Sequence, residues 1–137
     1  MDQDTILALF RRSGALLEGH FQLSSGLHSP GYLQCALVLQ HPQEASLLGA
    51  EIAARASQLK PEIVVSPALG GVVIGQEVAR GLNTRAIFVE RRDGTMALRR
   101  GFKLQLGERV LIVEDVVTTG RSTRETIEVV RGAGAQV

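Results

Sequence analysis

The sequence is poor in cysteine, in aromatic residues and in charge of one sign. Its single cysteine, Cys35, excludes an intramolecular disulfide framework and a cysteine-based zinc site, and it predicts a reducing compartment. The chain has 15 Lys and Arg against 14 Asp and Glu. The resulting formal charge of +1 indicates neither a nucleic-acid partner nor an acidic disordered tail.

The sequence also lacks a long hydrophobic run. Its longest charge-poor apolar stretch, residues 63–76, is too short to span a membrane and is interrupted by Pro67 and three glycines. Met1 is followed by Asp-Gln-Asp rather than by a basic stretch leading into an apolar run, so no secretory signal is expected. The protein is therefore predicted to be cytoplasmic and to have no membrane partner.

What the sequence does contain is an ordinary apolar content of 45% and an unusual 15 glycines in 137 residues. This length and apolar content fit one domain, residues 1–137, whose core needs no disulfides. The first part, about residues 1–40, is expected to hold a helix at 4–12 and a hairpin-like element with strands at 21–23 and 32–39. A helix is then expected from Pro42 to about residue 59, since proline is favourable at a first helical position.

From residue 61 onward, short apolar strands alternate with glycine-rich turns and helices. Strands are expected at 63–65, 86–89 and 109–113, helices at 72–81 and 122–131, and a polar, arginine-rich loop at 90–102. After Arg131 the pattern is that of a helix stop followed by the start of a further strand. The alternation predicts an α/β fold with a mostly parallel central sheet flanked by helices. Ligands of such sheets bind beyond the carboxyl ends of the strands, at the turns after residues 65, 89 and 113.

The most informative run spans residues 110–123, where a buried strand ends in two carboxylates and a hydroxyl-rich turn precedes a helix. A helix N-terminus offers unpaired N–H groups to an anion, and Gly120 lets the backbone approach it closely. Glu114 and Asp115 suit sugar hydroxyls or a hydrated Mg²⁺. The run matches neither the Walker A loop nor the GxGxxG turn. For any single residue of the run, a helix cap is the alternative interpretation.

This run resembles the signature of type I phosphoribosyltransferases, which use 5-phosphoribosyl 1-pyrophosphate (PRPP) with Mg²⁺. The resemblance implies the fold of that family, with about residues 41–137 as an α/β core that binds PRPP. It implies that Glu114 and Asp115 contact the ribose hydroxyls, that residues 117–122 wrap the 5-phosphate, and that the backbone of residues 68–71 meets the pyrophosphate. No protein residue is assigned as a metal ligand. The implied PRPP-binding residues are Gly70, Gly71, Glu114, Asp115, Val117, Thr118, Thr119, Gly120, Arg121 and Ser122.

A second stretch, residues 21–32, resembles the F-x-L-x-S-G-x-x-S-P-x-aromatic segment of orotate phosphoribosyltransferases. In that family the segment forms part of a small N-terminal hood over the base. The resemblance therefore places a hood within about residues 1–40 and implies that Ser25, Gly26 and Tyr32 contact orotate. The chain departs from the family at Ser24, where many members have Lys, and at residues 68–71, where many have Tyr-Lys-Gly.

The arginine-rich segment, residues 90–101, stands where many members carry a catalytic Lys-x-His-Gly loop, but it contains no histidine. The resemblance implies catalytic roles for Arg91, Arg92 and Arg99, with Arg100 as a further candidate, and for Asp115. Cations at this position would stabilise the charge that develops on departing pyrophosphate. A solvated charged turn is the alternative interpretation of this segment.

Together these resemblances imply a pentosyltransferase that joins PRPP to orotate, giving orotidine 5′-monophosphate and pyrophosphate in pyrimidine biosynthesis. They imply a homodimer with loop residues reaching the neighbour's site, and a chain truncated at its C-terminus, before an orotate-contacting arginine. The alternatives are a phosphoribosyltransferase for another base, a non-catalytic PRPP-sensing regulator, and a receiver-like signalling domain. The last would need an acid after Val65, where Ser66 and Pro67 stand.

Overall fold

The computed structural model describes residues 1–22 and 26–137, which form two compact units, Met1–Ala45 and Ser46–Val137. α1 begins after Asp2, whose Oδ1 accepts a 2.8 Å hydrogen bond from the Thr5 N–H, as an N-cap residue does. This confirms the helix predicted over residues 4–12. The elements of the first unit are α1 (Gln3–Arg12), β1 (Leu16–Gln22), β2 (His28–Leu33) and α2 (Cys35–Leu39).

β1 and β2 form an antiparallel hairpin, as the sequence predicts, but β1 begins at Leu16 rather than at residue 21. Their pairing starts at Leu16 and Leu33, and its register shifts between Glu18 and Phe21. The strand predicted over residues 32–39 is wrong beyond Leu33, because Cys35–Leu39 form the helix α2. Cys35, Val38 and Leu39 are buried, and their spacing places them on one helical face. A short apolar run fits a buried strand or a buried helix equally well, so periodicity alone does not separate the two.

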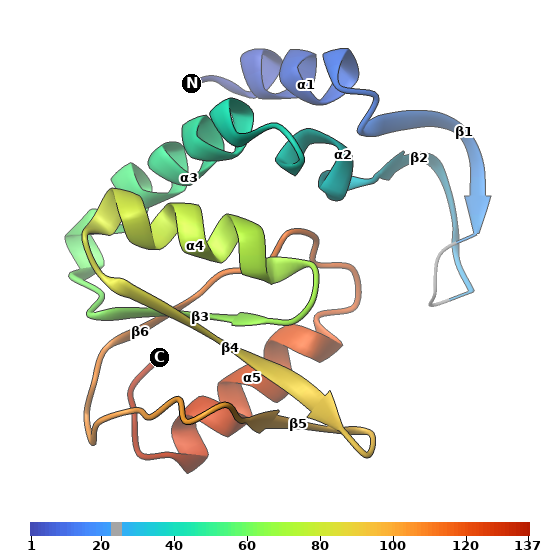
Figure 1. The fold of residues 1–137 in the computed structure, drawn as a ribbon. Helices are drawn as coiled ribbons and strands as arrows, with labels where there is room; N and C mark the ends of the chain where they lie inside the picture. The colour runs from blue at the N-terminus through green and yellow to red at the C-terminus, as the bar shows by residue number, and fades with distance from the viewer. Residues whose placement is uncertain (23–25) are drawn as a thin grey trace. The chain divides into compact units, whose positions relative to one another are not determined.

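The second unit contains a four-stranded sheet with the order β5-β4-β3-β6 (Figure 1). β4, β3 and β6 run parallel, and β5 joins β4 antiparallel. This confirms the mostly parallel sheet flanked by helices. The remaining elements are α3 (Pro42–Ala56), the 3₁₀ turn Ser57–Leu59, β3 (Ile63–Pro67), α4 (Gly71–Leu82), β4 (Arg85–Arg92), β5 (Thr95–Leu98), β6 (Val110–Ile112) and α5 (Arg121–Gly132).

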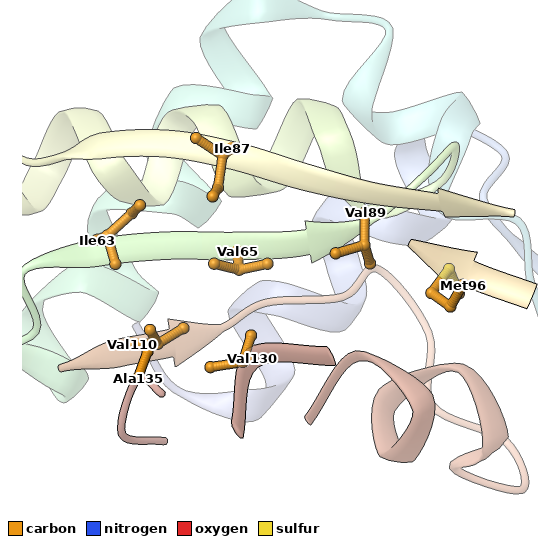
Figure 2. Packing of buried hydrophobic residues seen from close by; sticks show 8 residues of the cluster. All are labelled: Ile63, Val65, Ile87, Val89, Met96, Val110, Val130 and Ala135. Carbon is orange, nitrogen blue, oxygen red and sulfur yellow. The ribbon is translucent and has the colours of Figure 1, made fainter. Parts of the chain in front are cut away.

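Every residue of β3 is buried, and its successive side chains pack on opposite faces of the sheet. Val64 and Ser66 point to one face, where Gly75 of α4 lies against them. A strand covered on both faces explains the unbroken β-branched run of β3, as expected in a parallel sheet. The opposite face carries an apolar cluster with β4, β5, β6 and α5 (Figure 2), made of Ile63, Val65, Ile87, Val89, Met96, Val110, Val130 and Ala135.

The polar loop predicted over residues 90–102 is wrong in part, because most of it is strand. β4 continues to Arg92, and the chain turns at Asp93 and Gly94 and returns as β5. Both turn residues have positive φ, 53° and 79°, as in the tight turns that match the twist of a hairpin. Met96 of β5 is buried in the cluster of Figure 2, which holds the returning strand on the sheet. The Asp-Gly pair is the sequence signal that predicts such a hairpin.

After α5 the chain returns to the sheet beside β6. Gln136 forms a parallel bridge with Arg109, and its carbonyl oxygen accepts a 2.7 Å hydrogen bond from the Val110 N–H. The further strand that the sequence predicts after Arg131 therefore begins to pair beside β6.

Small residues line the contact between α3 and α4. A Cβ at Gly49 would lie 2.7 Å from the carbonyl carbon and 2.9 Å from the carbonyl oxygen of Glu77. A Cβ at Gly81 would lie 2.7 Å from the Cβ of Ala53. The two helices therefore approach closely only because these glycines have no side chain.

Gly49→Ala is expected to lower the free energy of unfolding by about 1–3 kcal/mol, since the new methyl group must displace the backbone of α4. Urea unfolding measures this change. Gly132→Ala is the matched control because nothing lies within 4 Å of a Cβ built there. The control is expected to change stability by no more than about 1 kcal/mol. An unfolding free energy unaffected by Gly49→Ala would contradict this account of helix packing.

Candidate functional site

The candidate site lies where the parallel strands β3 and β6 end and their chains turn into α4 and α5. β3 and β6 are hydrogen-bonded neighbours, and the Val113 N–H continues the pairing by donating to the Val65 carbonyl at 3.1 Å. Residues 68–70, which include a cis peptide between Ala68 and Leu69, connect β3 to α4. Residues 113–120 connect β6 to α5. Adjacent pairing therefore brings these two loops together at one edge of the sheet, as the sequence predicts.

Asp115 and Gly70 lie against each other where the two loops meet. A Cβ built on Gly70 would lie 2.8 Å from both Oδ1 and Oδ2 of Asp115, so the carboxylate occupies the space that any other side chain would need. Gly70 is the residue that precedes α4, where the positive end of the helix dipole favours a carboxylate. Gly71 is buried, and a Cβ there would lie 3.1 Å from the Val113 carbonyl oxygen. Both glycines thus permit the close approach of the two loops.

Glu114 is held by the first turn of α5. Its Oε2 accepts a 2.8 Å hydrogen bond from the Thr123 hydroxyl. Partial burial raises the pKa of Glu114 above its ordinary value, the Thr123 hydrogen bond acts in the opposite direction, and the neighbouring Asp115 charge raises it slightly further. Thr123 of α5 therefore orients the Glu114 carboxylate, which the family resemblance assigns to the ribose hydroxyls.

Thr123→Val is expected to raise the pKa of Glu114 further, because it removes the hydrogen bond that favours the ionised form. If activity needs the ionised carboxylate, the acidic limb of the pH profile of kcat/KM for PRPP moves to higher pH. Thr84→Val is the matched control, since the Thr84 hydroxyl is buried and has no hydrogen-bond partner among the described residues. A profile that shifts equally in both variants, or in neither, would contradict this role of Thr123.

The last part of the β6–α5 loop, residues 117–120, is mostly exposed, and hydrogen bonds hold its end. Gly120 has a positive φ of 81°, which glycine adopts without strain. The Arg124 guanidinium donates a 2.9 Å hydrogen bond to the Thr119 carbonyl, and the Arg121 N–H donates to the Thr119 hydroxyl at 3.3 Å. The backbone N–H groups in the first turn of α5 have no hydrogen-bond partners within the helix, so they can bind an anion. Val117, also predicted to bind, is 62% exposed.

Three of the four predicted loop arginines form ion pairs, with two different glutamates. Arg91 on β4 pairs with Glu125 of α5, with Nη1–Oε2 at 2.7 Å, and Arg121 Nε lies 2.9 Å from the Oε1 atom of the same carboxylate. Arg99 and Arg100 instead pair with Glu90, at 2.7 and 2.8 Å. The hydrogen bond from Arg100 holds the pKa of Glu90 below its ordinary value. Arg92 is exposed on the hairpin and has no ion pair with the described residues.

The residues predicted to form the hood belong to the first unit. Gly26 has a positive φ of 87° and is exposed, and the ring of Tyr32 lies 5.9 Å from that of Phe21, centroid to centroid. Ser25 lies outside the described residues. The base-binding role of all three residues stays a prediction.

Sequence reasoning missed two residues that organise this site, Arg124 and Glu125. The spacing of Arg121 and Glu125, four residues apart on a helix, is a signal for their ion pair. No local pattern indicates that Arg91, 34 residues away, joins the same carboxylate.

No helix in the described part of the chain is long and apolar enough to cross a membrane.

Comparisons with known proteins agree on one family. A family model described as phosphoribosyl transferase domain matches residues 38–137. The orotate phosphoribosyltransferase of Novosphingobium aromaticivorans is 58% identical over 140 residues, covering all of this chain and 72% of that protein. That of Pelotomaculum thermopropionicum is 53% identical over 137 residues, with the same coverage of 100% and 72%. The crystal structure of orotate phosphoribosyltransferase from Aeropyrum pernix is 28% identical, with a TM-score of 0.75 over 95% of this chain and 75% of that one.

Proposed function

The chain belongs to the orotate phosphoribosyltransferase family, and we propose that it transfers the phosphoribosyl group of PRPP to orotate. The products are orotidine 5′-monophosphate and pyrophosphate. The observation that carries the proposal is the contact between the β3–α4 and β6–α5 loops, with the Asp115 carboxylate against Gly70. This contact places a carboxylate that can accept hydrogen bonds from sugar hydroxyls close to the N-termini of α4 and α5. Helix N-termini bind phosphate groups through their unpaired backbone N–H groups.

In this proposal the β6–α5 loop and the first turn of α5, residues 117–122, bind the 5-phosphate of PRPP. Support comes from the positive φ of Gly120 and from the Arg124 hydrogen bond that fixes the Thr119 carbonyl. Glu114 and Asp115 accept hydrogen bonds from the ribose hydroxyls. These contacts lie away from the bond that breaks, so their binding energy positions the anomeric carbon for attack.

The reaction exchanges one bond at the anomeric carbon. N1 of orotate gives up its proton to solvent and forms a bond to this carbon, while the bond to the pyrophosphate oxygen breaks and the pyrophosphate leaves with the bonding electron pair. Backbone N–H groups at Gly70 and Gly71 and the cations Arg91, Arg92 and Arg99 stabilise the charge that develops on the leaving group. Support for this role is the position of the arginines on and after β4, a strand that pairs with β3.

Mg²⁺ fits this site as an ion carried by the substrate. Among the described residues, no group of three or more His, Cys, Asp or Glu could hold a metal. Mg²⁺ commonly binds through one or two carboxylates together with substrate phosphates and waters, and Glu114 and Asp115 are the carboxylates available. When bound, the ion neutralises charge on the pyrophosphate.

Two further parts of the proposal concern the base and the assembly. Ser25, Gly26 and Tyr32 are proposed to contact orotate as parts of a hood. A cytoplasmic homodimer is proposed from the family alone, and sedimentation of the purified protein at twice the chain mass of 14.7 kDa would support it.

The proposal is tested by incubating the protein with PRPP, Mg²⁺ and each base in turn and measuring pyrophosphate release. Release with orotate alone is the expected result. Release with a purine or another pyrimidine would replace the proposed substrate. PRPP binding without release with any base would favour the PRPP-sensing regulator instead.

A further inference from the structure

Neighbouring residues near the start of α5 contact three different parts of the site. The helix therefore connects the acidic pair, the β6–α5 loop and the β4–β5 hairpin. The three contacts are Thr123 with Glu114, Arg124 with Thr119, and Glu125 with Arg91.

Glu125 makes the most extensive of these contacts. Its Oε2 accepts a 2.7 Å hydrogen bond from Arg91 Nη1, and its Oε1 accepts from Arg91 Nη2 at 3.0 Å and from Arg121 Nε at 2.9 Å. The Glu125 side chain is 23% exposed and that of Arg91 is 37% exposed. A two-point pair of this kind is stronger and more directional than a single contact between mobile surface side chains.

The carboxylate holds two guanidinium groups together that would otherwise repel each other. Arg91 and Arg121 both lie within 3.0 Å of Glu125 Oε1. Two cations at such short range separate unless an anion lies between them. Removing the Glu125 charge is therefore expected to release Arg91 from α5 and to move the hairpin tip that carries it.

The cluster of Arg91, Arg121 and Glu125 keeps the capacity to bind an anion. An arginine has five N–H donors, and among the described residues the Arg121 guanidinium donates only through its Nε, to Glu125, so both of its Nη groups can bind a ligand. Two arginines and one glutamate leave one positive charge on the cluster. Arg121 is the first residue of α5 and directly follows Gly120, so this charge lies beside the loop proposed to bind the 5-phosphate.

We propose that Glu125 is a positioning residue for PRPP, which holds Arg91 of the β4–β5 hairpin and Arg121 at the start of α5 in one cationic cluster. This inference rests on the proposed function only in naming PRPP as the ligand. Glu125 contacts no substrate in this account and acts through the two arginines. It explains why an acid lies within a site for phosphate groups.

The test compares Glu125→Gln and Glu125→Ala with the control Glu128→Gln, whose side chain is exposed and lies three residues further along α5. Calorimetry gives the Kd for PRPP, and steady-state kinetics give the KM values for PRPP and for orotate. Glu125→Gln is expected to raise the Kd and KM for PRPP about fivefold to tenfold, as for groups coupled through one network. The KM for orotate and the thermal midpoint are expected to stay unchanged, and so are all values for the control.

A triple variant separates this role from a merely structural one. Adding Glu125→Ala to the double variant Arg91→Ala with Arg121→Ala is expected to weaken PRPP binding no further, because Glu125 acts only through these two arginines. A further loss of PRPP binding in the triple variant would overturn the proposal. So would a fall in thermal midpoint with an equal rise in both KM values, or unchanged PRPP binding in Glu125→Gln.

Failure of this inference and failure of the proposed function give different results. If the unaltered protein binds PRPP but releases no pyrophosphate with orotate, the proposed reaction fails. The Kd for PRPP of the Glu125 variants then still decides the role of Glu125.

Discussion

Replacing both acids of the β6–α5 loop, as Glu114→Gln with Asp115→Asn, is expected to lower kcat/KM for PRPP by about a thousandfold. Each hydrogen bond between an ionised carboxylate and a hydroxyl contributes about 1.5–3 kcal/mol, and the two amides keep the shape while removing both charges. Steady-state pyrophosphate release at saturating orotate measures the loss.

Glu128→Gln is the control for this double variant, because it removes an exposed carboxylate of α5 with no assigned role. The thermal midpoint of the double variant is expected to remain close to that of the unaltered protein, since both acids are only half-buried. Unchanged kinetics would rule out the assignment of the acidic pair to ribose.

Gly70→Ala is expected to reduce turnover by about a hundredfold, the size of effect that follows when a reacting group is misplaced by about 1 Å. The added methyl group would meet both Asp115 carboxylate oxygens at 2.8 Å, so the carboxylate must move away from Gly70. Gly70 is exposed, and the atoms that must yield are the end of a side chain rather than backbone. Activity is therefore expected to fall while the free energy of unfolding changes little.

Gly49→Ala is the comparison that separates a loss of turnover from a loss of stability. Gly49 faces the backbone of Glu77, so alanine there is expected to reduce stability without touching the site. Gly132→Ala is expected to leave turnover unchanged and to change stability by no more than about 1 kcal/mol, because a Cβ there meets nothing within 4 Å. A Gly70→Ala variant that loses stability as Gly49→Ala does, or that keeps full turnover, would contradict the role given to the Gly70–Asp115 contact.

Local patterns predicted most elements of the second unit. The β-branched run at Ile63 is strand because it is buried on both faces, and the glycines that follow β3 lie at the start of α4. The errors arose where a local pattern fits two structures. The apolar run from Cys35 to Leu39 fits strand or helix, and the charged residues after Glu90 hid a hairpin whose only signal is the Asp93-Gly94 turn.

The sequence by itself determined the acidic pair, the loop after it and the helix that follows, because these residues are contiguous and a strand–turn–helix places them by local geometry. Only the tertiary structure decided which distant residues meet there. Gly70 reaches Asp115 because β3 and β6 are neighbours in the sheet. Glu125 reaches Arg91, 34 residues earlier in the chain, because α5 packs beside β5 and the hairpin it forms with β4. Such contacts depend on strand order and helix packing, and spacing along the chain does not determine either.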